Sequence, residues 1–259
     1  MEPNTRKTLD YGFFHFLPGN RLIRKKKVDL LIQSIMQRDL TPLYPIVINN
    51  LMQIIDGQHR FEACKKLKRP IYYKVIEDAG LELAQTVSSS SSGWTIGDYV
   101  HSNKEKGNQN YFILDEFVKA YSIPYLVSAQ LLSGQYYGLT KSPDKRVSFE
   151  IKRGSFEVTN AKEAEAIGNY INQLHKDIGR SILRSSAFLR AFILLYSRGE
   201  KLVISLINKL GINPGPKLSY SSTVRDFVRQ FEDILNFRRH GENYLSLSDL
   251  IVLGKGNGG

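Results

Sequence analysis

A short run of polar residues around a glycine has the residue types and spacing of a phosphate-binding turn. The run is Asp56, Gly57, Gln58, His59 and Arg60. The residues before it are apolar and favour a β-strand, and those after it have helical spacing, so a helix begins at or near the glycine. The first amide groups of a helix lack intrahelical partners and lie at the positive end of its dipole, where anions bind. We therefore predict a strand, a tight turn with positive φ at Gly57, and a helix whose start binds phosphate.

The same residues allow a simpler interpretation and a different chemistry. In the simpler one, Asp56 caps the helix, while His59 and Arg60 form a solvated first turn. In the different chemistry, Asp56 contacts a metal, and Asp56, His59 and Glu62 surround an ion that activates water. Glu62 and His59 project from one helical turn, and no second acidic cluster lies near them in the sequence. We therefore expect a site that binds rather than cuts, and leave enzymatic activity open.

The motif resembles two related families. Asp-Gly-Gln-His-Arg followed by Phe-Glu-Ala, at residues 56–63, is similar to the Gly-Glu-Arg-Arg-x-Arg-Ala box of the ParB N-terminal domain and to the Gly-Cys-His-Arg box of sulfiredoxin, which share a fold. The DGQHR form is most similar to ParB-like proteins of phages and mobile elements. The resemblance implies a nucleoside triphosphate with Mg²⁺ as the cofactor. The phosphate or nucleotide contacts expected on this basis are Gly57, Gln58, His59, Arg60, Arg24 and Lys25.

Two departures narrow what the resemblance implies. Sulfiredoxin chemistry requires a cysteine where this chain has Gln58, so we exclude that activity. ParB proteins carry a third motif, Glu-Asn-x-x-Arg, which helps to hold the magnesium nucleotide. This chain has Leu-Ala-Gln-Thr-Val at 83–87 and then serines at 88–92, which predict a flexible loop. Nucleotide hydrolysis therefore lacks an expected ligand, whereas phosphate binding survives the change.

Several short segments are expected to hold this turn in place. An aromatic segment predicts a first strand, and a basic stretch then leads into an amphipathic helix. Two β runs joined across a pair of asparagines predict a hairpin, and another strand follows the second helix. The expected ranges are 11–17 for the first strand, 28–37 for the helix, 45–48 and 52–55 for the hairpin, and 71–76 for the last strand. This order matches the ParB and sulfiredoxin domain, so the expected fold class is α+β.

A helix-turn-helix is expected after the serine run. Residues 112–121 and 125–133 have helical spacing, and Pro124 begins the second helix. ParB proteins carry such an arrangement after their N-terminal domain, and an exposed second helix would read bases in the major groove. The polar candidates for base contacts are Tyr125, Ser128, Gln130 and Gln135. An ordinary helical hairpin explains the pattern equally well.

A β-hairpin with a basic tip is predicted at residues 146–159. Apolar residues alternate with polar ones from Val147 to Ile151, and Lys152 and Arg153 stand at the turn. In a winged helix, such a tip contacts the phosphate backbone of DNA. A tip that serves only solubility is the alternative. Beyond this hairpin the chain is expected to be helical.

Composition limits the class of protein. The chain has 259 residues, 42% of them hydrophobic, which suits two small folded domains. A formal net charge of +11 favours phosphate-rich partners, nucleic acid first. A single cysteine, Cys64, excludes an internal disulfide framework, and no apolar run is long enough to span a membrane. We therefore expect a cytoplasmic protein without membrane contact.

The expected organisation and function follow from these features. We expect a ParB/sulfiredoxin-like domain at 1–92, a mostly α-helical domain with the helix-turn-helix and the β-hairpin at 93–253, and a flexible tail at 254–259. The predicted function is that of a ParB-like DNA-binding protein, with DNA and a nucleotide as partners and a homodimer as a further candidate. A metal-dependent ParB-like nuclease is one alternative. A degenerate ParB-like fold used only for protein association is another, and the missing third motif favours it.

Overall fold

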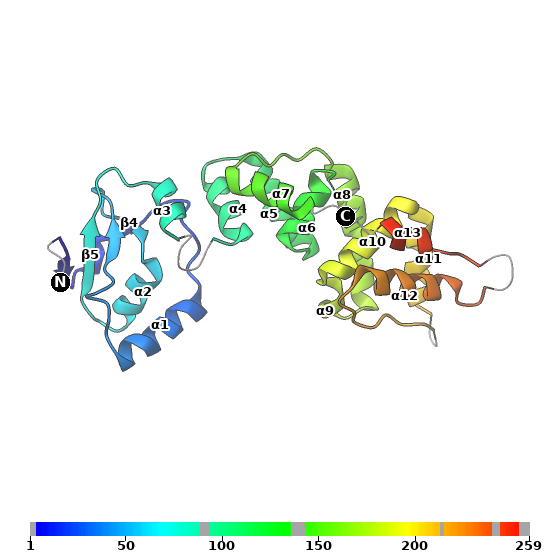
Figure 1. The fold of residues 1–259 in the computed structure, drawn as a ribbon, viewed down its shortest axis with the longest axis horizontal. Helices are drawn as coiled ribbons and strands as arrows, with labels where there is room; N and C mark the ends of the chain where they lie inside the picture. The colour runs from blue at the N-terminus through cyan, green and yellow to red at the C-terminus, as the bar shows by residue number, and fades with distance from the viewer. Residues whose placement is uncertain (1–3, 89–93, 136–142, 213–214, 240–243, 254–259) are drawn as a thin grey trace. The chain divides into compact units, whose positions relative to one another are not determined.

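The chain folds into two compact units, residues 1–108 and 109–259 (Figure 1). The computed structural model describes residues 4–88, 94–135, 143–212, 215–239 and 244–253. The fold class is α+β, as predicted, with a mixed sheet in the first unit and helices in both. The predicted serine loop falls largely on 89–93 and the predicted tail on 254–259, both outside the described residues.

The first unit contains the sheet and the predicted phosphate-binding turn. Its elements are β1 (Arg6–Thr8), the 3₁₀ turn η1 (Tyr11–Phe13), β2 (His15–Phe16), α1 (Lys25–Gln37), β3 (Ile46–Ile48), β4 (Gln53–Asp56), α2 (Gln58–Lys66), β5 (Ile71–Val75), α3 (Leu81–Ser88) and α4 (Ile96–Glu105). The predicted helix before the hairpin, the hairpin, the helix that follows the box (residues 56–60) and the last strand are all present. The hairpin prediction is confirmed, because β3 and β4 pair antiparallel.

The edges of the sheet differ from the prediction. The strand order is β1-β5-β3-β4-β2, and β1 forms within the polar N-terminal segment, where no strand was expected. The strand predicted at 11–17 is reduced to His15–Phe16. The reason is local, since the Asp10 carboxylate accepts a hydrogen bond of 2.9 Å from the Gly12 amide and thereby caps the η1 turn.

Strand β4 is buried on both faces and delivers the turn to its place. Ile54 packs with Val28 and Phe61 in the core beneath α1 and α2, whereas Ile55 packs with Ala84 of α3. Successive side chains of a strand point to opposite faces, so neighbouring apolar residues serve two cores. The end of β4 is therefore fixed from both sides, at the point where the chain enters α2.

Helix α4 belongs to the first unit. Its capping box joins Thr95 to Asp98, and the Arg24 guanidinium reaches the same two side chains, at 2.9 Å from Thr95 Oγ1 and 2.5 Å from Asp98 Oδ2. Asp98 is almost fully buried, so its charge needs this cationic partner. The division between the units consequently lies after Asn108.

The described part of the second unit is helical. Its elements are α5 (Gln109–Tyr121), α6 (Tyr125–Leu132), α7 (Pro143–Arg153), α8 (Ala161–Gln173), the 3₁₀ turn η2 (Leu174–Lys176), α9 (Arg180–Leu183), α10 (Ser186–Arg198), α11 (Glu200–Leu210), α12 (Val224–Asn236) and α13 (Ser248–Leu253). The predicted sequence of helix, short turn and helix is present as α5 and α6, with Ser122 at φ 54° in the turn. No helix among the described residues combines the length and the apolar character needed to cross a bilayer.

The β-hairpin predicted at residues 146–159 is wrong, because helix α7 occupies most of it. Val147 and Ile151 are fully buried, whereas Phe149 between them is 53% exposed. Residues four apart share one face of a helix, so the two buried residues fit helical spacing, and only Phe149 made the segment look alternating. Gly154, at φ 80°, ends the helix in a left-handed conformation.

Gly168 in α8 allows a close contact with α5 and provides a test of the packing. A Cβ added there would lie 2.7 Å from the ring of Tyr121. Alanine is favoured over glycine in a helix by about 1 kcal/mol, but overpacking costs about 1–3 kcal/mol. We expect Gly168→Ala to lower the free energy of unfolding in urea denaturation. In a Tyr121→Ala background the same change should raise it, and equal effects in both backgrounds would contradict the contact.

Candidate functional site

The predicted turn between β4 and α2 is present and requires glycine. Gly57 has φ 89° and ψ 16°, a left-handed conformation, and α2 begins at the next residue. A Cβ on Gly57 would lie 2.7 Å from Cγ2 of Ile46 and 2.9 Å from Nη2 of Arg60. Both the backbone conformation and the space therefore exclude a larger residue. The prediction of a positive φ at this position is confirmed.

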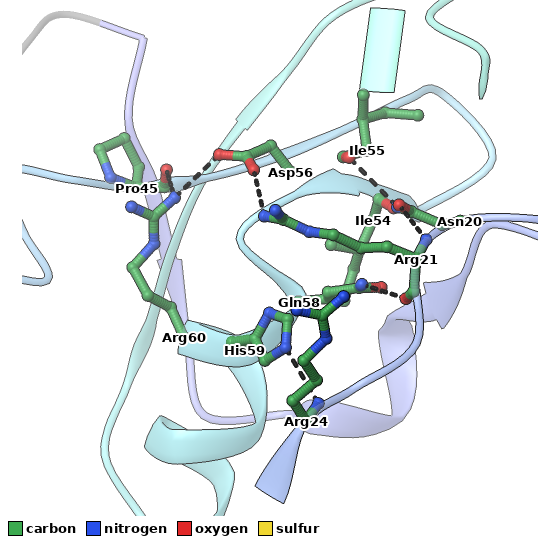
Figure 2. Close-up of polar contacts among 10 residues, drawn as sticks. All are labelled: Asn20, Arg21, Arg24, Pro45, Ile54, Ile55, Asp56, Gln58, His59 and Arg60. Carbon is green, nitrogen blue, oxygen red and sulfur yellow. Dashed lines mark hydrogen bonds and ion pairs between the residues drawn. The ribbon is translucent and has the colours of Figure 1, made fainter. Parts of the chain in front are cut away.

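Gln58 and His59 are buried and hold the basic segment that precedes α1 (Figure 2). The Gln58 side-chain amide donates to the carbonyl of Arg21, and Nε2 of His59 accepts a 3.1 Å hydrogen bond from the Arg24 amide. Asn20 completes the attachment by donating to the carbonyls of Ile54 and Ile55, each at 3.2 Å. Gln58 and His59 therefore position the neighbouring segment. Neither side chain carries a positive charge, so they lack the charge that the predicted phosphate contact would use.

Two arginines converge on Asp56 at the end of β4. Nη2 of Arg60 lies 3.2 Å from Oδ2 of Asp56, and Nη2 of Arg21 lies 3.7 Å from Oδ1 (Figure 2). Arg60 also donates to the Pro45 carbonyl at 3.4 Å. Its Nε atom is buried and, within the part of the chain that the structure describes, has no hydrogen-bond partner. The site therefore contains more donor capacity than its single carboxylate uses.

A cavity of about 370 Å³ opens beside this turn. Its lining residues come from the segment before α1, from α1 itself and from the turn, and they are Arg21, Lys27, Leu30, Leu31, Asp56, Gly57, His59 and Arg60. Three of these side chains are cations and one is a carboxylate. The cavity is therefore electropositive, which suits an anionic ligand.

The positive charge around the cavity affects the pKa of His59. Burial, followed by repulsion from Arg21, Lys27 and Arg24, lowers the pKa of the imidazole from 6.5 to about 4. His59 is therefore neutral at pH 7, and because its Nε2 accepts a hydrogen bond, we place its proton on Nδ1. A neutral, buried imidazole holds the segment without adding to the repulsion.

The cations on the α1 side differ from those predicted. Arg24 is bound to Asp98, and Lys25 is exposed and does not line the cavity. Arg21 and Lys27 line the cavity in place of the predicted Arg24 and Lys25. Helical spacing could have identified Lys27, because Leu30 and Leu31 follow it by three and four residues and line the same cavity. Arg21 precedes the helix, and no periodic signal marks it.

The structure provides no further ligands for the metal contact predicted at Asp56, among the residues that it describes. Its carboxylate is already engaged by Arg21 and Arg60. Among the described residues there is no group of three or more histidine, cysteine, aspartate or glutamate side chains that could hold a metal ion. Asp56, His59 and Glu62 therefore do not form the metal centre that the nuclease hypothesis requires.

The base-contacting face predicted on α6 is wrong. Ser128 and Gln130 are fully buried, and the Ser128 hydroxyl donates to the Ile123 carbonyl at 3.2 Å. The Tyr125 hydroxyl donates to Asp115 at 2.6 Å. Burial and the hydrogen bond to this carboxylate raise the pKa of the phenol, so the hydroxyl keeps the proton that it donates. Helix α6 packs against α5, α7 and α8, so it forms the centre of a core and presents no polar face to a groove. Gln135 follows it and donates to Glu150 at 3.0 Å.

Lys152 and Arg153 are exposed, as a phosphate contact requires, but they lie in the last turn of α7 rather than at a hairpin tip. The Arg153 guanidinium stands 4.3 Å from the centroid of the Phe149 ring. This stacking explains how Phe149 is retained on an exposed face, since a cation covers part of the ring.

Comparison with protein-family models, curated proteins and solved structures gives no match for this chain. Its function is therefore inferred from the residues of the site and from their geometry.

The depressed pKa of His59 has a consequence for stability. Above pH 6.5 the imidazole is neutral in both states and contributes no pH dependence. Between pH 6.5 and about 4 the unfolded state binds a proton that the folded state does not, so stability falls as pH falls, at ~1.4 kcal/mol per unit at most. We expect His59→Gln to lose less stability than wild type between pH 7 and 4.5 in urea denaturation. His15→Gln, at an exposed histidine, is the matched control. If the pH dependence of stability were the same in His59→Gln as in wild type, the lowered pKa of His59 would be contradicted.

Proposed function

We propose that this chain is a ParB-like DNA-binding protein, of the phage or mobile-element type, whose first unit binds the phosphates of a nucleotide at the Gly57 turn. The observation that carries the proposal is the convergence of Arg21, Lys27 and Arg60 on one cavity that contains a single carboxylate, Asp56. Guanidinium and ammonium groups form charge-assisted hydrogen bonds with phosphate oxygens. A phosphate would therefore neutralise the excess positive charge.

The size of the cavity and the helix start support a nucleotide rather than a single ion. A volume of about 370 Å³ lies within the roughly 300–1,000 Å³ typical of small-molecule sites. The start of α2 adds backbone amides at the positive end of the helix dipole, without a side-chain cap from Gly57. Gly57, His59 and Arg60 line the cavity, so the start of α2 forms part of its wall.

The residues present do not fit a magnesium ion held by the protein. Mg²⁺ requires carboxylate or carbonyl oxygens in near-octahedral geometry, and Asp56 is the one carboxylate that lines the cavity. Two arginines already neutralise it. We therefore propose phosphate binding without protein-held magnesium and derive no hydrolytic step.

DNA binding is supported by charge. The formal net charge of +11 attracts a polyanion, and Lys152 and Arg153 are exposed at the end of α7. Lysine and arginine contacts to phosphates release counterions, so the interaction should weaken as salt rises. We expect a cytoplasmic location, where nucleotides and DNA are both available to such a protein.

A second candidate function is protein association by a box that has lost its ligand. The observation in its favour is that Asp56 pairs with Arg21 and Arg60 and thereby occupies the place of an anion. Gln58 and His59 are likewise engaged within the protein. In this reading the box is a purely structural element.

Charge-changing variants separate the two readings. We expect Arg21→Gln and Arg60→Gln each to weaken the binding of fluorescent cytidine or adenosine triphosphate by about tenfold, the loss of one charge-assisted contact. Asp56→Asn should strengthen binding, because it removes the competing carboxylate. Lys26→Gln, an exposed lysine of α1 that does not line the cavity, is the control and should change affinity little.

Fluorescence anisotropy with and without magnesium provides the measurement, and circular dichroism establishes that each variant is folded. Binding that is equal in wild type and in the Arg21→Gln, Arg60→Gln double variant would sink the nucleotide reading and leave the association reading.

A further inference from the structure

A second basic pocket lies within the second unit, far along the chain from the Gly57 turn. It has a volume of about 120 Å³ and forms where the end of α5 meets α8, η2 and α9. Its lining residues are Tyr121, Ser122, Ile171, His175, Arg180, Leu183 and Arg184. None of them is acidic. Tyr121 and Ser122 belong to the predicted helix-turn-helix, whereas the other five residues lie in none of the motifs that the sequence singled out.

The local fold brings the two arginines to one side. The Arg184 amide donates to the Arg180 carbonyl at 3.1 Å, so the two residues are separated by one helical turn and project from the same face. Ile171 and Leu183 are buried and provide an apolar floor, while His175, Arg180 and Arg184 are exposed at the rim. Ser122 follows α5 in the left-handed conformation and supplies a hydroxyl at the same pocket.

The arginines of this pocket lack the internal partners that other arginines have. Arg69 lies 2.7 Å from Asp39, and Arg24 lies 2.5 Å from Asp98. Within the described residues neither Arg180 nor Arg184 forms an ion pair with a carboxylate. Two guanidinium groups, an imidazole and a hydroxyl therefore present donors around a small space that contains no protein anion.

We infer that this pocket binds one backbone phosphate of a nucleic acid. Its volume is well below the roughly 300 Å³ of a site for a whole small molecule, so it suits a single anionic group rather than a nucleotide. Guanidinium groups bind phosphate oxygens in a bidentate manner. The exposed rim admits a phosphate that is part of a polymer, and the net charge of +11 favours a polyanion over an isolated phosphorylated residue.

The inference rests on the proposed DNA binding and deepens it, because it moves the DNA contact away from α6. The face of α6 is buried, whereas Lys176 of η2, Arg180 of α9 and Arg184 after it are exposed cations. A phosphate contact positions DNA without reading its sequence. The pocket should therefore contribute equally to duplexes of different sequence.

The test compares two double variants that lose the same charge. Arg180→Gln with Arg184→Gln removes the pocket, and Arg225→Gln with Arg229→Gln removes two exposed arginines of α12. Binding of a fluorescent DNA duplex to the full chain is measured by anisotropy over a range of salt concentrations. We expect the pocket variant to lose about tenfold or more in affinity at low salt, and the magnitude of its slope of log affinity against log salt to fall by about one, because one phosphate contact is lost.

The control variant should change affinity less than the pocket variant, with a slope near that of wild type. Equal losses in the two double variants would overturn the pocket, because general charge would then explain both. Arg184→Lys adds a second criterion: it retains the charge but not the bidentate geometry, so an affinity equal to wild type would also count against the site. Wild type that binds no duplex would overturn the DNA-binding proposal itself, an outcome distinct from the failure of the pocket alone.

Discussion

The attachment of the basic segment before α1 to the start of α2 is the constraint on which the first unit depends. Gln58 donates to the Arg21 carbonyl, and His59 accepts from the Arg24 amide, and both of these side chains are buried. Breaking either bond would leave a buried polar group unsatisfied, which costs about 1–3 kcal/mol. The two bonds therefore fix the path of the segment, and that path determines that Arg21 faces Asp56 while Arg24 faces Asp98.

Much of the first unit could be predicted because its signals are local. Apolar runs, Gly57 and the asparagines of the hairpin each specify a short piece of backbone, and these pieces are present. The partners of the cations could not be predicted in this way. Whether Arg21 or Arg24 faces the cavity depends on long-range contacts with β4 and α4, which spacing along the chain does not reveal. The edge strand β1 likewise depends on pairing with distant β5 rather than on its own composition.

The second unit shows where sequence patterns are ambiguous. The helices α5 and α6 could be predicted, but not which face of α6 is buried, because its polar residues Ser128 and Gln130 lie in the core. A polar residue usually indicates exposure, but a short helix surrounded by α5, α7 and α8 has almost no exposed side. In α7, one exposed aromatic residue, Phe149, converted a helical pattern into an apparent strand pattern, and cation stacking by Arg153 explains its presence there.

The electrostatic cost of the Gly57 site bears on whether it is structural or binds a ligand. Burial, together with repulsion from Arg21 and Arg24, lowers the pKa of Lys27, which means that the charged lysine is less stable in the folded protein than in the unfolded chain. Replacing Lys27 with a neutral residue would remove its repulsion with Arg21 and Arg24. Elsewhere in the same unit, Arg69 has a carboxylate partner of its own, Asp39, at 2.7 Å. Three cations that line a cavity with one carboxylate repel one another, and a bound anion would reduce that repulsion; this is the physical basis for proposing a ligand at the turn over a box retained for association.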